Sequence, residues 1–76
     1  PLTVIGWTDT EGDSAYNKRL ALSRAQAVKD YLVSKGVSQD RVSVVGAGES
    51  DKFDNTSEAG RKLNRRVDIV FGRRGI

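Results

Sequence analysis

The fold of this 76-residue chain is decided by the stretch LTVIGWTDTEGD at residues 2–13. Its first part, Leu2–Trp7, is rich in β-branched and aromatic residues and predicts a strand that ends in a polar turn at Gly12. From about Asn17 to Lys35 the apolar residues recur every three or four positions, which is typical of one face of a helix. These apolar residues are Leu20, Ala21, Ala25, Val28, Tyr31 and Leu32. The stretch therefore predicts the first half of a strand–helix–strand unit.

The residues after this helix predict a second strand, a short helix and a third strand. Ser14 or Asn17 is expected to cap the start of the long helix, and Lys35 and Gly36 are expected to end it. The other elements are expected as a strand at Val42–Val45, a loop at Gly46–Ser50, a short helix at Ser57–Leu63 and a strand at Val67–Phe71. A strand, a helix and a strand in close succession form a parallel crossover. We therefore predict an α/β fold, an α+β sandwich, with a mixed sheet, helices packed on one face and the order strand–helix–strand–helix–strand.

The composition bounds the kinds of site that the chain can hold. It is 37% hydrophobic and 30% charged, as in a globular domain, and residues 1–76 are expected to form one small domain. There is no Cys and no His, which removes disulfides, thiolate metal sites and the commonest general base. No two carboxylates are paired near one turn, and no apolar run approaches the roughly 20 residues of a membrane span. We therefore expect no metal, no cofactor and no enzymatic activity.

The charge is basic and unevenly spread. The chain has 13 Lys and Arg against 10 Asp and Glu, a formal net charge of +3. The basic residues gather in the long helical segment and in the C-terminal part, as Lys18, Arg19, Arg24, Lys29, Lys35, Arg61, Lys62, Arg65, Arg66, Arg73 and Arg74. Such a balance favours anionic partners, so a nucleic-acid-binding or protein-interaction module is one interpretation, and a solvated face without a partner is another. The chain lacks the interleaved aromatic and basic residues of single-strand readers.

Two residues of opposite charge flank the polar turn. Asp9 stands at the end of the first predicted strand, and Arg24 stands inside the helix that follows. A carboxylate and a guanidinium near one turn suit a zwitterion, a ligand with an ammonium and a carboxylate group on one carbon. Arg65, at the start of the last strand, is expected to add a second cation. The plainer interpretations stay open: Asp9 as a turn former that pairs with Arg24, and Asn17 as a helix cap.

Several spaced motifs run through almost the whole chain. They are TDxxG at residues 8–12, YNxxLxxxRAxxVxxYL at 16–32, GxGE at 46–49 and GRxxNRRVDI at 60–69. In this order they resemble the OmpA-like C-terminal domain, the peptidoglycan-associating module of Gram-negative outer-membrane proteins, lipoproteins and flagellar stator proteins. The resemblance implies a periplasmic domain, associated with the outer membrane, that binds the diaminopimelate of the peptidoglycan stem peptide without a covalent bond. Such a domain anchors the outer membrane or a membrane complex to the cell wall.

The resemblance also implies a role for each residue of the site. Asp9 matches the aspartate that receives the diaminopimelate ammonium, and Arg24 matches the arginine that takes its carboxylate. Thr8 and Asn17 match neighbours that contribute hydrogen bonds, and Arg65 matches the first arginine of the Asn-Arg-Arg motif at the edge of the pocket.

The chain departs from the family pattern at its beginning. The family domain opens with another strand and helix, and residues 1–76 carry neither, so the resemblance predicts a partial domain that is truncated at its N-terminus. The membrane anchor of the parent protein is expected outside this stretch. An unpaired strand edge is also expected, which favours edge pairing or homo-oligomerisation.

Overall fold

The computed structural model describes residues 1–72. Its elements are β1 (Leu2–Thr8), α1 (Ser14–Ser34), the short 3-10 helix η1 (Gln39–Arg41), β2 (Val42–Glu49), α2 (Glu58–Asn64) and β3 (Val67–Phe71). Two helices and a mixed sheet in the expected order confirm the predicted α/β class. Arg73 and Arg74, which the sequence groups with the C-terminal basic residues, lie outside the described residues.

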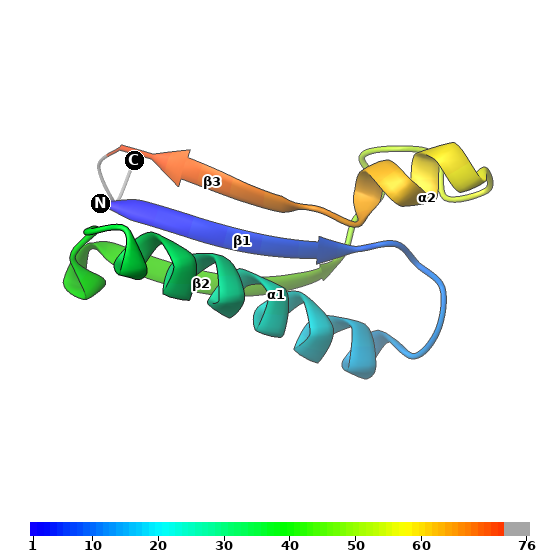
Figure 1. Ribbon diagram of the computed structural model, residues 1–76. Coiled ribbons are helices and arrows are strands. Elements are labelled where there is room, and N and C mark those ends of the chain that lie inside the picture. Colours follow the sequence, from blue (N-terminus) through cyan, green and yellow to red (C-terminus); the bar gives the residue numbers. More distant parts are fainter. Residues whose placement is uncertain (73–76) are drawn as a thin grey trace.

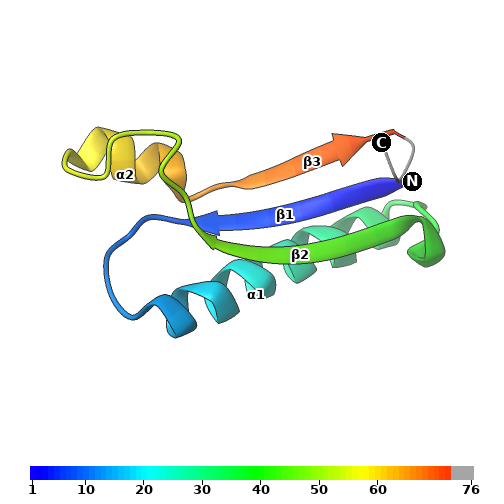
Figure 2. The same ribbon diagram turned by 180° about the vertical axis from the view of Figure 1, so that it is seen from behind.

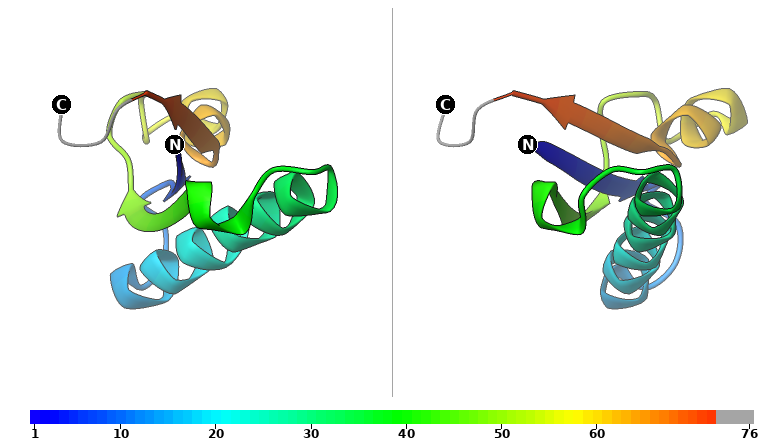
Figure 3. Two further views of the ribbon diagram at one scale, coloured as in Figure 1. Left: turned by 90° about the vertical axis from the view of Figure 1, so that its left-hand side faces the viewer. Right: turned by 60° about the vertical axis from the view of Figure 1, so that its left-hand side comes forward.

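The sheet has the strand order β2–β1–β3, with β1 parallel to β2 and antiparallel to β3 (Figure 1). α1 lies along one face of the sheet, and the view from behind shows the other face without a helix of the described chain (Figures 2 and 3). α2 lies beyond the end where β1 stops and β3 begins (Figure 1). At the opposite end of the sheet, the amide of Gly72 donates to the carbonyl oxygen of Pro1 at 3.3 Å, so both ends of the described chain meet there.

The core is small and lies between α1 and the sheet. Alternate residues of β1 point toward α1, and Val4 in the centre of this row is fully buried. It packs with Ala25 of α1 and Val42 of β2. The partly buried residues around this centre are Leu2, Val28, Leu32, Val37, Val44 and Val67.

Two paired glycines bring α1 close to the sheet. Gly6 of β1 and Gly46 of β2 lie side by side in the parallel ladder. A Cβ atom on Gly6 would overlap the carbonyl oxygen of Ala21, and one on Gly46 would lie 2.7 Å from Cβ of Leu22. The backbone of α1 therefore rests directly on the glycine pair, and this contact fixes where the polar residues of α1 stand relative to the end of β1.

The start of α1 corrects the predicted cap. The cap is Asp13, whose side chain accepts a hydrogen bond from the amide of Tyr16 at 2.9 Å. Ser14 is the first helical residue, and Asn17 lies within the helix, so neither residue caps it. Asp at this position satisfies a free amide of the first turn as well as Ser or Asn does, and residue type alone does not choose among them. The predicted end is confirmed at Gly36, which has a φ of +106°.

Three other expectations are wrong in detail. β2 continues to Glu49 through the predicted loop at Gly46–Ser50, because pairing with β1 extends past a bulge and overrides the poor strand propensity of glycine. Tyr31 is 61% exposed and lies beside Lys35, so it does not belong to the buried stripe of α1. Arg65 ends α2 and does not open β3, which begins at Val67.

Candidate ligand-binding site

The candidate site begins at Asp9, the first residue after β1. Asp9 is only 6% exposed, and both of its carboxylate oxygens are occupied. Oδ1 accepts from the backbone amide of Glu11 at 3.0 Å, and Oδ2 accepts from Nη1 of Arg65 at 2.5 Å. The structure thus brings together two of the predicted site residues, which stand 56 positions apart in the sequence.

Arg65 is one member of a larger ionic network. Its Nη2 donates to Oε2 of Glu58 at 2.9 Å. The other oxygen of Glu58 accepts from Nε and Nη2 of Arg61, at 3.1 and 2.9 Å. Arg61 also donates to the carbonyl oxygen of Asn55 at 3.1 Å and lies 3.7 Å from a carboxylate oxygen of Glu11. We call the set Asp9, Glu11, Glu58, Arg61 and Arg65 the ionic network.

The ionic network carries an excess negative charge. Three carboxylates in it face two guanidinium groups. Asp9 is the least exposed of the carboxylates, so its charge is the one least screened by water. A cation that joined the network next to Asp9 would bring the set to neutrality.

Arg24 supplies a separate positive charge. It lines a cavity of about 430 Å³ together with Arg65, and the other lining residues are Ala27, Val28, Arg66 and Val67. Within residues 1–72, Arg24 forms no ion pair and no side-chain hydrogen bond, in contrast to Arg65. No hydrogen bond or ion pair joins Arg24 to Asp9 within residues 1–72, so the plainer interpretation, in which these two residues pair, does not hold there. Arg65 connects the two residues, because it lines the same cavity as Arg24 and donates a hydrogen bond to Asp9.

Thr8 and Asn17 shape the turn that carries Asp9. The hydroxyl of Thr8 donates to the backbone carbonyl oxygen of Asp9 at 2.9 Å. Nδ2 of Asn17 donates to the carbonyl oxygen of Glu11 at 2.7 Å and to Oε2 of Glu49 at 3.2 Å. Both residues are buried, and both hold the backbone around Asp9 in place. Their hydrogen bonds to a ligand stay a prediction.

Arg66 also lines the cavity, and its charge is neutralised. Its Nε donates to both carboxylate oxygens of Asp68, at 3.1 and 3.3 Å, and its Nη1 donates to Ser50 at 3.1 Å. Its guanidinium carbon lies 5.0 Å from the centre of the Trp7 ring, and the indole nitrogen of Trp7 donates to Asp68 at 3.0 Å. Arg66 is thus locked against β1 and β3, which leaves Arg24 as the free cation of this cavity in the described chain.

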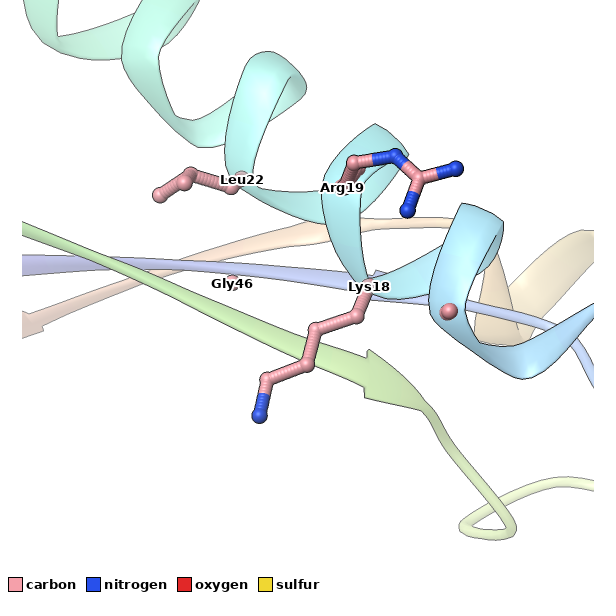
Figure 4. Close-up of a pocket in the computed structure, with 5 residues that line it drawn as sticks. Lys18, Arg19, Leu22 and Gly46 are labelled. Carbon is pink, nitrogen blue, oxygen red and sulfur yellow. The ribbon is translucent and has the colours of Figure 1, made fainter.

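A second hollow lies on the other side of α1, against β2. It has a volume of about 410 Å³, and its lining residues are Ala15, Lys18, Arg19, Leu22 and Gly46. The side chains of Lys18 and Arg19 extend away from one another (Figure 4). Its polar groups therefore do not converge on one ligand position, and the cavity at Arg24 is the stronger candidate.

Sequence reasoning missed three members of the ionic network. The sequence predicts Glu58 only as a residue of a short helix and Arg61 only as a member of the basic C-terminal part. It predicts Glu11 only as a residue of the polar turn. The spacing of Glu58 and Arg61, three positions apart on one helix, was a usable signal for their ion pair. Nothing local could have placed Glu11 beside Arg61, because their approach depends on where α2 lies relative to the end of β1.

The comparisons with known proteins fit this fold. A family model described as "OmpA family" matches residues 1–66. The chain belongs to the OmpA family. The matched region contains every residue of the predicted site, from Thr8 to Arg65.

Relatives in the OmpA family are longer than this chain. Outer membrane porin F of Pseudomonas fluorescens is 50% identical over 66 residues, which cover 86% of the chain and 20% of the porin. A Mycobacterium tuberculosis relative named peptidoglycan-binding protein ArfA is 41% identical over 70 residues, or 91% of the chain and 22% of that protein. The chain thus spans about a fifth of the length of these curated relatives.

Two solved structures share the fold. The crystal structure of the peptidoglycan-associated lipoprotein from Burkholderia pseudomallei superposes with a TM-score of 0.87 at 34% identity, over 91% of this chain and 59% of that one. The periplasmic domain of MotB superposes with a TM-score of 0.73 at 31% identity, over 90% of this chain and 39% of that one.

Two kinds of feature are not found in residues 1–72 of this OmpA-family chain. None of the described helices combines the length and the apolar character needed to cross a membrane. The same residues hold no group of three or more acidic side chains arranged around a common metal position.

The pKa of Asp9 reflects its place in the network. Burial alone would raise the pKa of this carboxyl group, but the amide of Glu11 and the guanidinium of Arg65 outweigh burial and hold the pKa below its ordinary value. A carboxyl group with a lowered pKa in the folded state stabilises the fold above its unfolded pKa, and this stabilisation is lost as the pH falls through the folded pKa.

We therefore expect Asp9→Asn to make stability less sensitive to acid. From about pH 5 to about pH 2, the free energy of unfolding of the wild type should fall more steeply than that of the variant. Urea unfolding at a series of pH values measures this difference. Asp51→Asn is the control, because Asp51 is exposed and makes no ion pair within the described chain. Equal slopes for the wild type and Asp9→Asn would contradict the expectation.

Proposed function

We propose that this chain is a non-enzymatic module that binds peptidoglycan without a covalent bond, through the diaminopimelate of the stem peptide. The observation that carries the proposal is the pattern of charge in the site: the excess negative charge around Asp9, and the positive charge of Arg24, which lines the same cavity as Arg65. The free end of diaminopimelate carries an ammonium and a carboxylate on one carbon. The ammonium would bind next to Asp9, and the carboxylate would bind to Arg24.

The nature of the two groups supports this orientation. A guanidinium group binds a carboxylate through two parallel donors, which sets direction as well as charge. Ala27, Val28 and Val67 give the cavity an apolar side that suits the methylene groups of the ligand. Charge-assisted hydrogen bonds contribute roughly 1.5–3 kcal/mol each, so three or four of them suit micromolar binding after ordering costs. Firm anchoring would come from many copies on one polymer.

The names of the relatives support a cellular location for the proposed module. Relatives of this chain are named as outer membrane proteins, as a peptidoglycan-binding protein and as a peptidoglycan-associated lipoprotein. We infer a periplasmic location, associated with the outer membrane, and a role in attaching that membrane or a membrane complex to the cell wall. The nucleic-acid alternative loses its main support, because Arg61, Arg65 and Arg66 are neutralised by nearby carboxylates.

A titration followed by NMR tests the proposed ligand. The labelled chain would be titrated with a stem peptide that contains diaminopimelate, and with the same peptide in which lysine replaces it. Lysine keeps the ammonium but lacks the terminal carboxylate. We therefore expect at least about tenfold weaker binding, which corresponds to the free energy of one hydrogen bond to a charged group. Amide shifts should gather at residues 8–12, around Arg24 and at the start of β3. Equal affinity for the two peptides, or shifts centred on Lys18, would contradict the proposal.

A further inference from the structure

Glu58 is the member of the ionic network that holds Arg65 from the side opposite Asp9. Its Oε2 accepts from Nη2 of Arg65 at 2.9 Å, while Nη1 of the same guanidinium donates to Asp9. Arg65 is therefore shared between two carboxylates, one nearly buried and one exposed. The other oxygen of Glu58 accepts both donors from Arg61, which is itself tied to the carbonyl oxygen of Asn55. Glu58 is thus fixed on one side by Arg61 and acts on Arg65 from the other.

A ligand ammonium at Asp9 would compete with Arg65. Oδ1 of Asp9 already accepts the amide of Glu11, and Oδ2 accepts Arg65. Two cations beside one carboxylate repel each other, and the repulsion is strong where water is largely excluded. The ammonium would bind more tightly if a second anion took up part of the charge of Arg65. Glu58 occupies the position from which a carboxylate can do this.

We propose that Glu58 is a positioning residue that sets the affinity of the site for the cationic end of its ligand, by sharing the charge of Arg65 with Asp9. The inference rests on the proposed function. Without the charge of Glu58, Asp9 is the one anionic partner that the described chain offers to Arg65. The ionic network then also has no excess negative charge for an ammonium group to neutralise.

The test compares Glu58→Gln with Glu11→Gln. Both changes remove one carboxylate charge from the ionic network, and both side chains contact Arg61, but only Glu58 touches Arg65. In calorimetric titrations with the diaminopimelate stem peptide, we expect Glu58→Gln to weaken binding about tenfold and Glu11→Gln to weaken it by less than about threefold. Equal losses in the two variants would overturn the role of Glu58, because they would reflect charge alone.

A double-mutant cycle separates positioning from loss of structure. If Glu58 acts through Arg65, Glu58→Gln should have no further effect on affinity in an Arg65→Gln background. If Glu58 only stabilised α2, the loss of affinity would be the same in both backgrounds, and the inference would be wrong. Failure of the proposed function is recognisable separately: the wild type would not bind the stem peptide, or Asp9→Asn would bind it as well as the wild type does. If the wild type binds, Asp9→Asn does not bind, and the effects at positions 58 and 65 are additive, the role of Glu58 is rejected and the proposed function stands.

Discussion

Replacing Arg24 with alanine should abolish retention of the protein by purified peptidoglycan while the fold survives. Arg24 lines the candidate site, and none of the carboxylates of residues 1–72 forms an ion pair with it. Its loss would leave the ligand carboxylate without its two parallel donors, which corresponds to a loss of about 100-fold in affinity. Because Arg24 makes no ion pair within residues 1–72, its removal should change the free energy of unfolding by less than about 0.5 kcal/mol.

Arg19→Ala is the matched control for this experiment. Arg19 is also an arginine of α1, and its replacement removes the same charge. It lines the hollow on the other side of the helix (Figure 4). Sedimentation with peptidoglycan should retain Arg19→Ala like the wild type and lose Arg24→Ala. Arg24→Lys should lie between them, since lysine keeps the charge but not the planar pair of donors. Equal retention of the two alanine variants would mean that binding depends on overall charge, and the proposed site would be wrong.

Replacing Gly6 with alanine should destabilise the fold by about 3 kcal/mol or more. The added Cβ atom would overlap the carbonyl oxygen of Ala21, a backbone atom that cannot turn aside. α1 would have to lift from the sheet, and the contact of Ala25 with Val4 and Val42 would open with it. A domain of this size has a stability of roughly 0.1 kcal/mol per residue, so the substitution would remove a large share of it. Urea unfolding followed by circular dichroism measures the loss.

Gly36→Ala provides the comparison for Gly6→Ala. Gly36 has no neighbouring atom within 4 Å of an added Cβ, but its φ of +106° strains any other residue. Its replacement should cost only about 1 kcal/mol, the cost of the left-handed conformation. Similar losses at Gly6 and Gly36 would mean that α1 does not rest on the glycine pair as the structure shows.

The fold could be predicted from the sequence where the signal was local. The strand at Leu2, the long helix, the short helix after Ser57 and the strand at Val67 each have a period or a cap of their own. The end of β2 could not be predicted, because Gly46–Glu49 becomes a strand only through pairing with β1. The exposure of Tyr31 could not be predicted from the spacing of apolar residues along α1, because only packing decides how far the sheet reaches around the helix.

The candidate site could be predicted in part. Asp9 and Arg24 stand out by their positions in motifs, but the sequence could not show that Arg65 is the residue that touches Asp9. That contact joins residues 56 positions apart and depends on where α2 comes to rest. The buried Asn64 was likewise missed as a structural residue: it is fully buried and bonds the backbone of Phe53 and the side chain of Asn55. It anchors the loop that leads into α2 and therefore helps to place Glu58, Arg61 and Arg65.

The hydrogen bond between Gly72 and Pro1 holds the two ends of the described chain together, far from the candidate site. Both ends of the described chain lie at one end of the sheet, and Asp9 lies at the other end. The seven residues of β1 separate them, a span of about 20 Å. A linker fixed to either end would hold the protein opposite its ligand. With a linker at the end of β3, tension toward the ligand would pass from β3 to β1, across ladder hydrogen bonds that lie crosswise to the pull. The hydrogen bonds of the β1–β3 ladder would then be loaded in shear and would share the force.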